Sequence, residues 1–202
     1  RITPGAVVTT LAGLAGQFGT ANGTGAAARF RFPSAVVVSG GALYVADRSN
    51  HAIRKMTAGG DVTTFAGQPG TLGYADGVGT AARFRQPSGV TASNGIIYVA
   101  DTSNRVIRAI AADGAVTTLA GVGGQQGTVD GVGAIARFVS PFALAAAGTS
   151  IYAVDDLAHV VRHVSTSGDV TTIAGSPGVP GSADGSGVAA RFDTPSGIAI
   201  LA

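Results

Sequence analysis

Residues 75–84 read ADGVGTAARF, and the same ten-residue pattern occurs three more times in the chain. The other copies are ANGTGAAARF at 21–30, VDGVGAIARF at 129–138 and ADGSGVAARF at 183–192. Their arginines lie 54 residues apart each time: Arg29, Arg83, Arg137 and Arg191. A fixed period kept along a whole chain is typical of a repeat protein, in which each copy is one structural unit stacked on its neighbours.

Two further features keep the period of 54. A proline follows each copy, at Pro33, Pro87, Pro141 and Pro195. A Val-Thr-Thr triplet begins at Val8, Val62, Val116 and Val170. The spacing predicts repeats of equal length, with no insertion or deletion between these anchors.

Composition limits the class of protein. The 202 residues are 46% hydrophobic and 12% charged, which is apolar enough for a folded core and too apolar for a disordered chain. Thirteen basic and eleven acidic residues give a net charge of +2 without a Lys/Arg run, which argues against a nucleic-acid footprint. No apolar run approaches the roughly 18 residues of a membrane-spanning helix. The absence of cysteine excludes disulfides and thiolate metal sites.

Within one repeat the pattern is that of short strands. Residues 86–121 contain four runs rich in Val, Ile, Thr and Tyr, at about 88–93, 96–100, 105–110 and 115–119. Ser93-Asn94-Gly95 and Asp113-Gly114 are tight-turn signals that join antiparallel strands. Four-stranded meanders repeated at this interval are typical of the blades of a β-propeller. The connection from about 67 to 87 is long, and its VGTAARF part predicts one helical turn.

The signature of each repeat resembles a known family. It comprises Pro-Ser-Gly-Val at 87–90, Ile-Tyr-Val-Ala-Asp at 97–101, Asn104, Ile107-Arg108 and Val-Thr-Thr-Leu-Ala-Gly at 116–121. This pattern is similar to the NHL repeat. The resemblance implies an all-β propeller of four-stranded antiparallel blades. It leaves function open, because such propellers include protein-binding, RNA-binding and sensor domains, and related rings include a lyase.

The expected organisation is one propeller segment over 1–202. Complete blades are expected at about 32–67, 86–121 and 140–175, with partial blades at 1–13 and 192–202. Arg1 aligns with Lys55 and Ala202 aligns with Gly40, so four full repeats lack a stretch equivalent to 41–54. The expectation is an open arc, belonging to a longer protein or joining a partner through its strand or blade ends.

Three sets of repeated residues are predicted to be structural, because a catalytic group is needed once and not in every copy. Aspartates end the second strand and arginines follow seven residues later, in positions suited to ion pairs. Arg-Phe pairs close the connections, with each Phe expected to be buried between blades and each Arg to bond carboxylates or carbonyls. The sets are Asp47, Asp101 and Asp155; Arg54, Arg108 and Arg162; and Arg29, Arg83, Arg137 and Arg191 with Phe30, Phe84, Phe138 and Phe192.

Glycine-rich connections carry an aspartate at Asp76, Asp130 and Asp184, with Asn22 in the first copy. Oxygen ligands in such loops suit Ca²⁺, but these loops lack the further carboxylates of a strong site. The preferred interpretation is a structural turn, and no cofactor or metal is expected beyond this weak calcium candidate.

Exceptions to the repeat point to a binding site. The third copy has Asp156, His159 and His163 where the second has Thr102, Arg105 and Ala109. On a strand, His159 and His163 would share a face about 13 Å apart, too far to hold one metal. A solvent-facing strand position is expected for His159 and for His51, which has the same phase. Any ligand is expected near Asp156 and His159.

The predicted function is a non-catalytic binding scaffold that displays loops to a protein, small-molecule or glycan partner. The first alternative is a propeller lyase or hydrolase with a metal in the central channel. The second is an RNA-binding NHL domain, against which the lack of a basic cluster argues. A bacterial-type protein in an extracellular or periplasmic location is the expectation for source and compartment.

Overall fold

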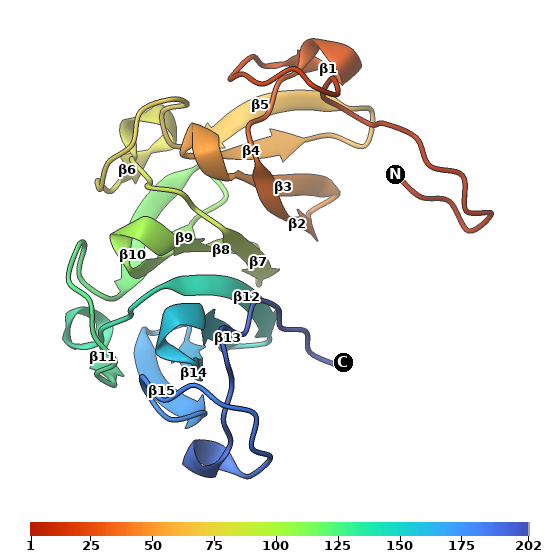
Figure 1. Ribbon diagram of the computed structural model, residues 1–202. Helices are drawn as coiled ribbons and strands as arrows, with labels where there is room; N and C mark the ends of the chain where they lie inside the picture. The colour runs from red at the N-terminus through yellow and green to blue at the C-terminus, as the bar shows by residue number, and fades with distance from the viewer. Residues whose placement is uncertain (202) are drawn as a thin grey trace.

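The computed structural model describes residues 1–201, and Ala202, the last residue of the expected partial blade, lies outside them. Three antiparallel sheets follow one another along the chain as blades of an open arc, with the chain ends apart (Figure 1). No helix within these residues is long and apolar enough to span a membrane. The three antiparallel sheets confirm the prediction of an all-β propeller architecture.

Each blade is a four-stranded meander. Blade 1 contains β2 (Pro33–Ser39), β3 (Ala42–Asp47), β4 (Ala52–Met56) and β5 (Asp61–Ala66). Blade 2 contains β7 (Gly89–Ser93), β8 (Ile96–Asp101), β9 (Val106–Ile110) and β10 (Ala115–Ala120). Blade 3 contains β12 (Pro141–Ala147), β13 (Ser150–Asp155), β14 (Val160–Ser165) and β15 (Asp169–Ala174). In every blade the strands hydrogen-bond in sequence order.

The hairpin turn predicted at Asn94-Gly95 is present. Ser93 pairs with Ile96, so the loop has two residues. Asn94 and Gly95 both have positive φ, at 50° and 77°. This is the conformation of the primed turns whose twist suits two-residue hairpins.

The number of strands per sheet differs from the prediction. Each sheet has five strands, because two residues of the preceding connection pair with the outermost strand. These short strands are β1 (Gly23–Thr24), β6 (Gly77–Val78) and β11 (Gly131–Val132). In blade 2, Gly77 and Val78 pair with Val116 and Ala115. A two-residue strand in a glycine-rich connection has no periodicity to reveal it.

Short 3₁₀ helices occur at two places in each repeat. Those in the connections include the turn predicted in VGTAARF: η1 (Gly25–Ala27), η3 (Gly79–Ala81), η5 (Gly133–Ile135) and η7 (Gly187–Ala189). The others join the second and third strands: η2 (Arg48–Asn50), η4 (Thr102–Asn104) and η6 (Asp156–Ala158). A residue with positive φ ends each of this second group, namely His51, Arg105 or His159.

The core lies between blades. Blade 1 contributes Ala42, Tyr44 and Ile53, which cluster with Val90, Ile97, Val99 and Ile110 of blade 2. The same arrangement joins blades 2 and 3 around Tyr98 and Ile107. Phe84 and Phe138 are fully buried, as expected for plugs between blades. Phe30 and Phe192, near the two ends of the arc, are only partly buried.

Candidate functional site

A buried ion pair lies at the centre of blade 2. Arg108 Nη1 donates to Asp101 Oδ2 at 3.0 Å, and both side chains are fully buried. Asn104 Nδ2 donates to the same oxygen at 2.8 Å, and the Arg85 backbone N–H donates to Oδ1 at 2.8 Å. Burial raises the pKa of Asp101 to about 6, although Arg108 and the hydrogen bonds oppose this rise.

The same guanidinium also holds the connection in place. Arg108 Nη2 donates to the Ala75 carbonyl at 2.8 Å and to Asp76 Oδ1 at 2.6 Å. Asp76 in turn accepts from the backbone N–H and the hydroxyl of Thr118, at 3.3 and 3.1 Å. The interpretation of Asp76 as a turn residue was therefore incomplete, because its carboxylate ties the connection to β9 and β10.

The other blades repeat this arrangement with differences. Equivalent contacts join Arg54 to Asp47 at 2.9 Å and to Asn22 at 2.8 Å, and Arg162 to Asp130 at 2.8 Å. The pair between Arg162 and Asp155 is longer, at 3.8 Å. Ala158 stands where the other blades have Asn50 and Asn104, and the Asp155 carboxylate accepts from the Val139 and Ser140 N–H groups. Burial also raises the pKa of Asp155.

The arginines of the Arg-Phe pairs bond carbonyls. Arg83 Nη1 donates to the carbonyls of Thr80, Ala81 and Ala82 at 2.6, 3.0 and 2.8 Å. Arg137 makes the same three bonds, and Arg29 and Arg191 each make two of them. These groups close the 3₁₀ turn of their own connection.

The three exceptional residues of the third copy do not form one cluster of ligands. Asp156 begins η6, and its Oδ1 accepts from the Leu157 N–H at 2.7 Å. His163 lies on β14, where Nε2 is 3.0 Å from Ser150 Oγ and the ring meets Tyr152 edge-on at 5.5 Å.

His159 is not on a strand, contrary to the prediction. It has φ of 59° at the end of η6, and its side chain is 15% exposed. Its Nδ1 accepts from the Thr194 N–H at 3.1 Å, as His51 Nδ1 accepts from Gln86 N–H at 3.2 Å. Both histidines thus fasten the start of the next repeat, so the expected solvent-facing strand position is wrong for both.

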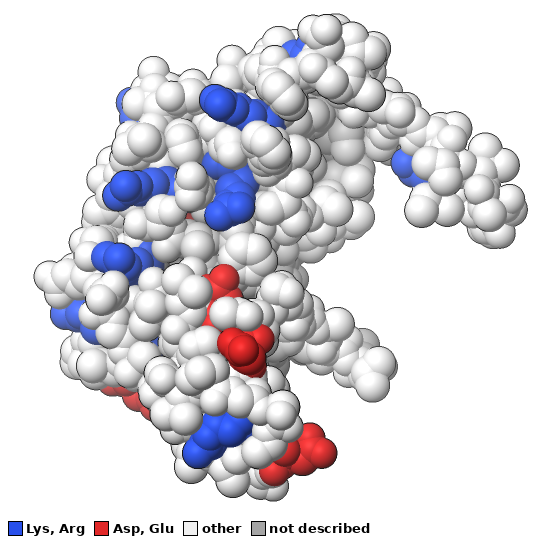
Figure 2. Space-filling model, in the orientation of Figure 1, with Lys and Arg blue, Asp and Glu red and all other residues white. Residues whose placement is uncertain are grey.

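A cavity of about 450 Å³ lies where η4 meets the start of blade 3. Three arginines line it, Arg48, Arg85 and Arg105, together with Thr102, Ser103, Gly124, Val139, Ser140 and Leu157. Figure 2 shows that most basic side chains in view lie over the first two blades, with acidic ones over the third blade and the segment after it. No local sequence pattern predicted this cavity. A feature of the sequence that marks it is Arg48, which stands where the later copies have Thr102 and Asp156.

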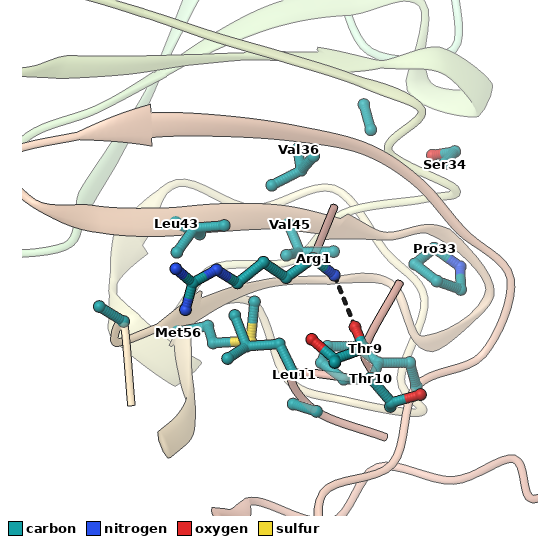
Figure 3. Close-up of a pocket in the computed structure, with 14 residues that line it drawn as sticks. Arg1, Thr9, Thr10, Leu11, Pro33, Ser34, Val36, Leu43, Val45 and Met56 are labelled. Atoms are coloured by element: carbon teal, nitrogen blue, oxygen red, sulfur yellow. Dashed lines mark hydrogen bonds between the residues drawn. The ribbon is translucent and has the colours of Figure 1, made fainter. Parts of the chain in front are cut away.

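A second, apolar groove of about 840 Å³ lies on the end face of blade 1. Val36, Leu43, Val45 and Met56 line one side, and Thr9, Thr10 and Leu11 the other. Figure 3 shows the Arg1 side chain lying along the groove beside Leu43 and Met56.

The N-terminal segment occupies the place of an outermost strand. A Cβ built on Gly60 would lie 2.6 Å from the Leu11 carbonyl oxygen, just as one on Gly168 would lie 2.6 Å from that of Leu119 in β10. The Arg1 ammonium donates to the Thr9 carbonyl at 2.7 Å, which matches the register of Lys55 with Thr63. The groove is therefore the space that the middle strands of a further blade would fill.

Family comparison agrees with this repeat geometry. The profile of the NHL repeat matches residues 30–56 and 84–105, which cover β2–β4 of blade 1 and β7–η4 of blade 2. These two segments are NHL repeats.

Similar curated proteins include NHL repeat-containing proteins. The chain is 41% identical over 97 residues to NHL repeat-containing protein 2 of Gallus gallus, covering 46% of this chain and 13% of that protein. It is 40% identical over 87 residues to the Homo sapiens protein, covering 43% of this chain and 12% of that one. Protein SUPPRESSOR OF QUENCHING 1, chloroplastic, of Arabidopsis thaliana is 36% identical over 97 residues, covering 46% and 9%. The match therefore spans about an eighth or less of these relatives.

Solved structures share the NHL-type propeller fold. An auxiliary nutrient binding protein from Bacteroides thetaiotaomicron aligns with a TM-score of 0.58 and 19% identity, over 78% of this chain and 40% of that one. A catalytically inactive virginiamycin B lyase from Staphylococcus aureus with quinupristin aligns with a TM-score of 0.50 and 19% identity, over 70% and 40%. At this identity the likeness concerns the fold alone.

The calcium candidate loops are engaged in other contacts. Asp76 and Asp130 each accept from a buried arginine and a threonine, and Asp184 is exposed. Among residues 1–201 no three His, Asp, Glu or Cys side chains converge as metal ligands would. Calcium binding by the NHL connections stays a prediction that these contacts do not favour.

Proposed function

We propose that this NHL segment is a non-catalytic interaction scaffold, and that its groove on blade 1 binds a β-hairpin of the NHL type. The observation that carries the proposal is a difference between equivalent positions. Val36 is 57% exposed on the end face of blade 1, whereas Val90, its equivalent in blade 2, is 6% exposed. Large exposed apolar patches mark interaction surfaces.

The chemistry of the partner follows from what covers the equivalent face inside the arc. Val90, Ile97 and Ile110 pack against Ala42, Tyr44 and Ile53 of the preceding blade. Those three residues belong to β3 and β4, which form one antiparallel hairpin. The same face is open on blade 1, with an outermost strand already provided by residues 9–12. A hairpin with small, aromatic and branched residues on one face therefore fits the groove.

The test uses the chain's own hairpin as the probe. A labelled peptide of residues 41–56, GALYVADRSNHAIRKM, is titrated with the 202-residue protein and followed by fluorescence anisotropy. We expect saturable binding, lost when the peptide carries Tyr44→Asp and Ile53→Asp. Val36→Asp in the protein should weaken binding at least about tenfold, since burial of a valine is worth about 1.5 kcal/mol or more.

The matched control is Leu72→Asp. Leu72 is also 57% exposed but lies in a connection and does not line the groove. We expect this variant to bind like the parent protein. Equal loss with both variants, or no binding by the parent protein at millimolar peptide, would contradict the proposal.

The two alternative functions have less support. A metal-dependent lyase needs several ligands at one point, and residues 1–201 bring no such group together. The solved neighbours include both binding proteins and a lyase, so their shared fold does not separate the two functions. An RNA-binding role has one supporting feature, the arginine-lined cavity.

A further inference from the structure

The arginine-lined cavity differs from the buried ion pairs of the three blades in its charge balance. Arg54, Arg108 and Arg162 each bond one or two carboxylates. Arg48, Arg85 and Arg105 form no ion pair among the described residues, and no residue lining their cavity is acidic. Three cationic groups therefore border one cavity without a compensating anion from the protein.

Their existing contacts leave most of their donors free for a ligand. Arg105 Nη1 donates to the Gly124 carbonyl at 2.7 Å. The Arg48 guanidinium lies 6.0 Å from the centre of the Phe142 ring, and its Nε is buried without a hydrogen-bond partner among residues 1–201. The Arg85 side chain is exposed. Arg54, Arg108 and Arg162 share this unpartnered Nε, so what distinguishes Arg48, Arg85 and Arg105 is that they have no carboxylate partner among residues 1–201.

The electrostatic effect extends to a neighbouring residue. The pKa of His51 is lowered, first by partial burial and then by the charges of Arg31 and Arg85. Positive potential at this part of the surface therefore disfavours a further cation, as expected where arginines are not neutralised.

The three arginines are not required by the repeat. Arg48 aligns with Thr102 and Asp156, Arg85 with Arg31, Val139 and Asp193, and Arg105 with His51 and His159. The blades form the same strands with each of these residues. The fold therefore does not need arginine at these positions. We infer that the three arginines meet at one cavity because they bind a ligand.

We propose that Arg48, Arg85 and Arg105 form a binding site for a small polyanionic ligand that carries phosphate or carboxylate groups. Guanidinium groups match the paired oxygens of both anions through two parallel hydrogen bonds. A volume of about 450 Å³ is within the range of small-molecule sites. The site is separate from the hairpin groove. Its arginines come from the first two copies, and its lining extends to Val139, Ser140 and Leu157 of the third copy, next to the position expected from the sequence.

Two probes distinguish the sources of the oxyanion. Pyrophosphate represents phosphate ligands and citrate represents carboxylate ligands, each titrated by calorimetry at 20 and 150 mM salt. We expect saturable binding of at least one probe, weaker at the higher salt concentration because exposed charges are screened. Arg48→Gln and Arg105→Gln should each weaken that binding at least tenfold.

The matched control is Arg31→Gln. Arg31 is the equivalent of Arg85 one repeat earlier, and it does not line the cavity. At 150 mM salt, where the more distant charge of Arg31 is screened, this variant should bind within about twofold of the parent protein. Melting curves should show that all variants are folded. If Arg48→Gln fails to fold, Arg105→Gln decides the result.

Three outcomes would overturn the proposal. The first is no binding of either probe at 5 mM, and the second is binding that Arg48→Gln and Arg105→Gln leave unchanged. The third is binding of a single-stranded RNA oligonucleotide far tighter than either probe and weakened equally by Arg31→Gln, which would indicate a broad nucleic-acid surface instead of a defined cavity.

Discussion

Replacing Arg108 by methionine should strongly destabilise the protein. The substitution preserves much of the side-chain length but leaves the Asp101 carboxylate fully buried without its cationic partner. It also removes hydrogen bonds to the Arg83 and Ala75 carbonyls and to Asp76, at 3.1, 2.8 and 2.6 Å. The connection before blade 2 would thus lose its attachment to β9.

The magnitude follows from the cost of an unpaired buried charge. Breaking one partner out of a buried pair costs about 3–5 kcal/mol of the free energy of unfolding. For a protein of this length, 1 kcal/mol corresponds to about 2–4 °C in melting temperature, so the expected fall is about 6–20 °C. Adding Asp101→Asn removes the buried charge, and the double variant should be more stable than the sum of the two single losses predicts.

The destabilisation should also depend on pH. Without Arg108, which lowers the pKa of Asp101, that pKa rises further above its present value of about 6. At pH 5 the folded variant then holds a proton that the unfolded chain, with its lower pKa, does not hold. Its stability relative to the parent protein therefore increases as pH falls from 7.5 to 5.

Thermal and urea denaturation followed by circular dichroism would measure these effects. The control is Arg105→Met, three residues away, which removes one bond to the Gly124 carbonyl and should cost at most about 1 kcal/mol. A fall of less than about 2 °C for Arg108→Met, or strict additivity with Asp101→Asn, would refute the reasoning.

Further predictions concern the same blade. Asn104→Ala should lower the free energy of unfolding in urea by about 1–3 kcal/mol, because it removes one buried and one partly buried hydrogen bond; a neutral result would mean that blade 2 adjusts as blade 3 does around Ala158. In the parent protein, protonation of Asp101 near pH 6 should raise the free energy of unfolding by up to about 3 kcal/mol as the pH falls towards 4. Denaturation curves of Asp101→Asn over the same pH range should lack this increase. Gly121→Ala should lower the melting temperature far more than Gly124→Ala, since both have positive φ but only Gly121 would place a Cβ 2.7 Å from a backbone oxygen; equal shifts would contradict this explanation.

The sequence predicted the parts of the fold that depend on local pattern. The period of 54 defines the units, and Asn94-Gly95 marks a hairpin because few other pairs tolerate two positive φ angles. The bond between Asp76 and Arg108 spans 32 residues, so no local signal revealed it. The prediction that His159 lies on a strand was wrong because its backbone has the left-handed conformation that ends η6, and the type of side chain does not reveal that conformation.

The candidate sites were harder to predict than the fold. Departures from the repeat pointed to the third copy as the binding site. Arg48 in the first copy departs from the repeat just as clearly. Three residues from three separate segments, Arg48, Arg85 and Arg105, meet at one cavity only through the packing of blades. The period predicts that blades stack, but it gives no angle or distance between them.

The short strand at the outer margin of each blade limits how the molecule can associate. In blade 2 the first residues of β10 are paired with Gly77 and Val78, and the Thr118 N–H is bonded to Asp76. Because the hydrogen-bond donors at this sheet edge are already paired, a strand of another molecule finds few groups to bond with. Edge-to-edge association into a continuous sheet is therefore suppressed. The faces of blades can still pack against one another, and each added blade has its own short strand that covers its outer edge. An array of such repeats can therefore be lengthened, by duplication or by design, without acquiring a flank that aggregates.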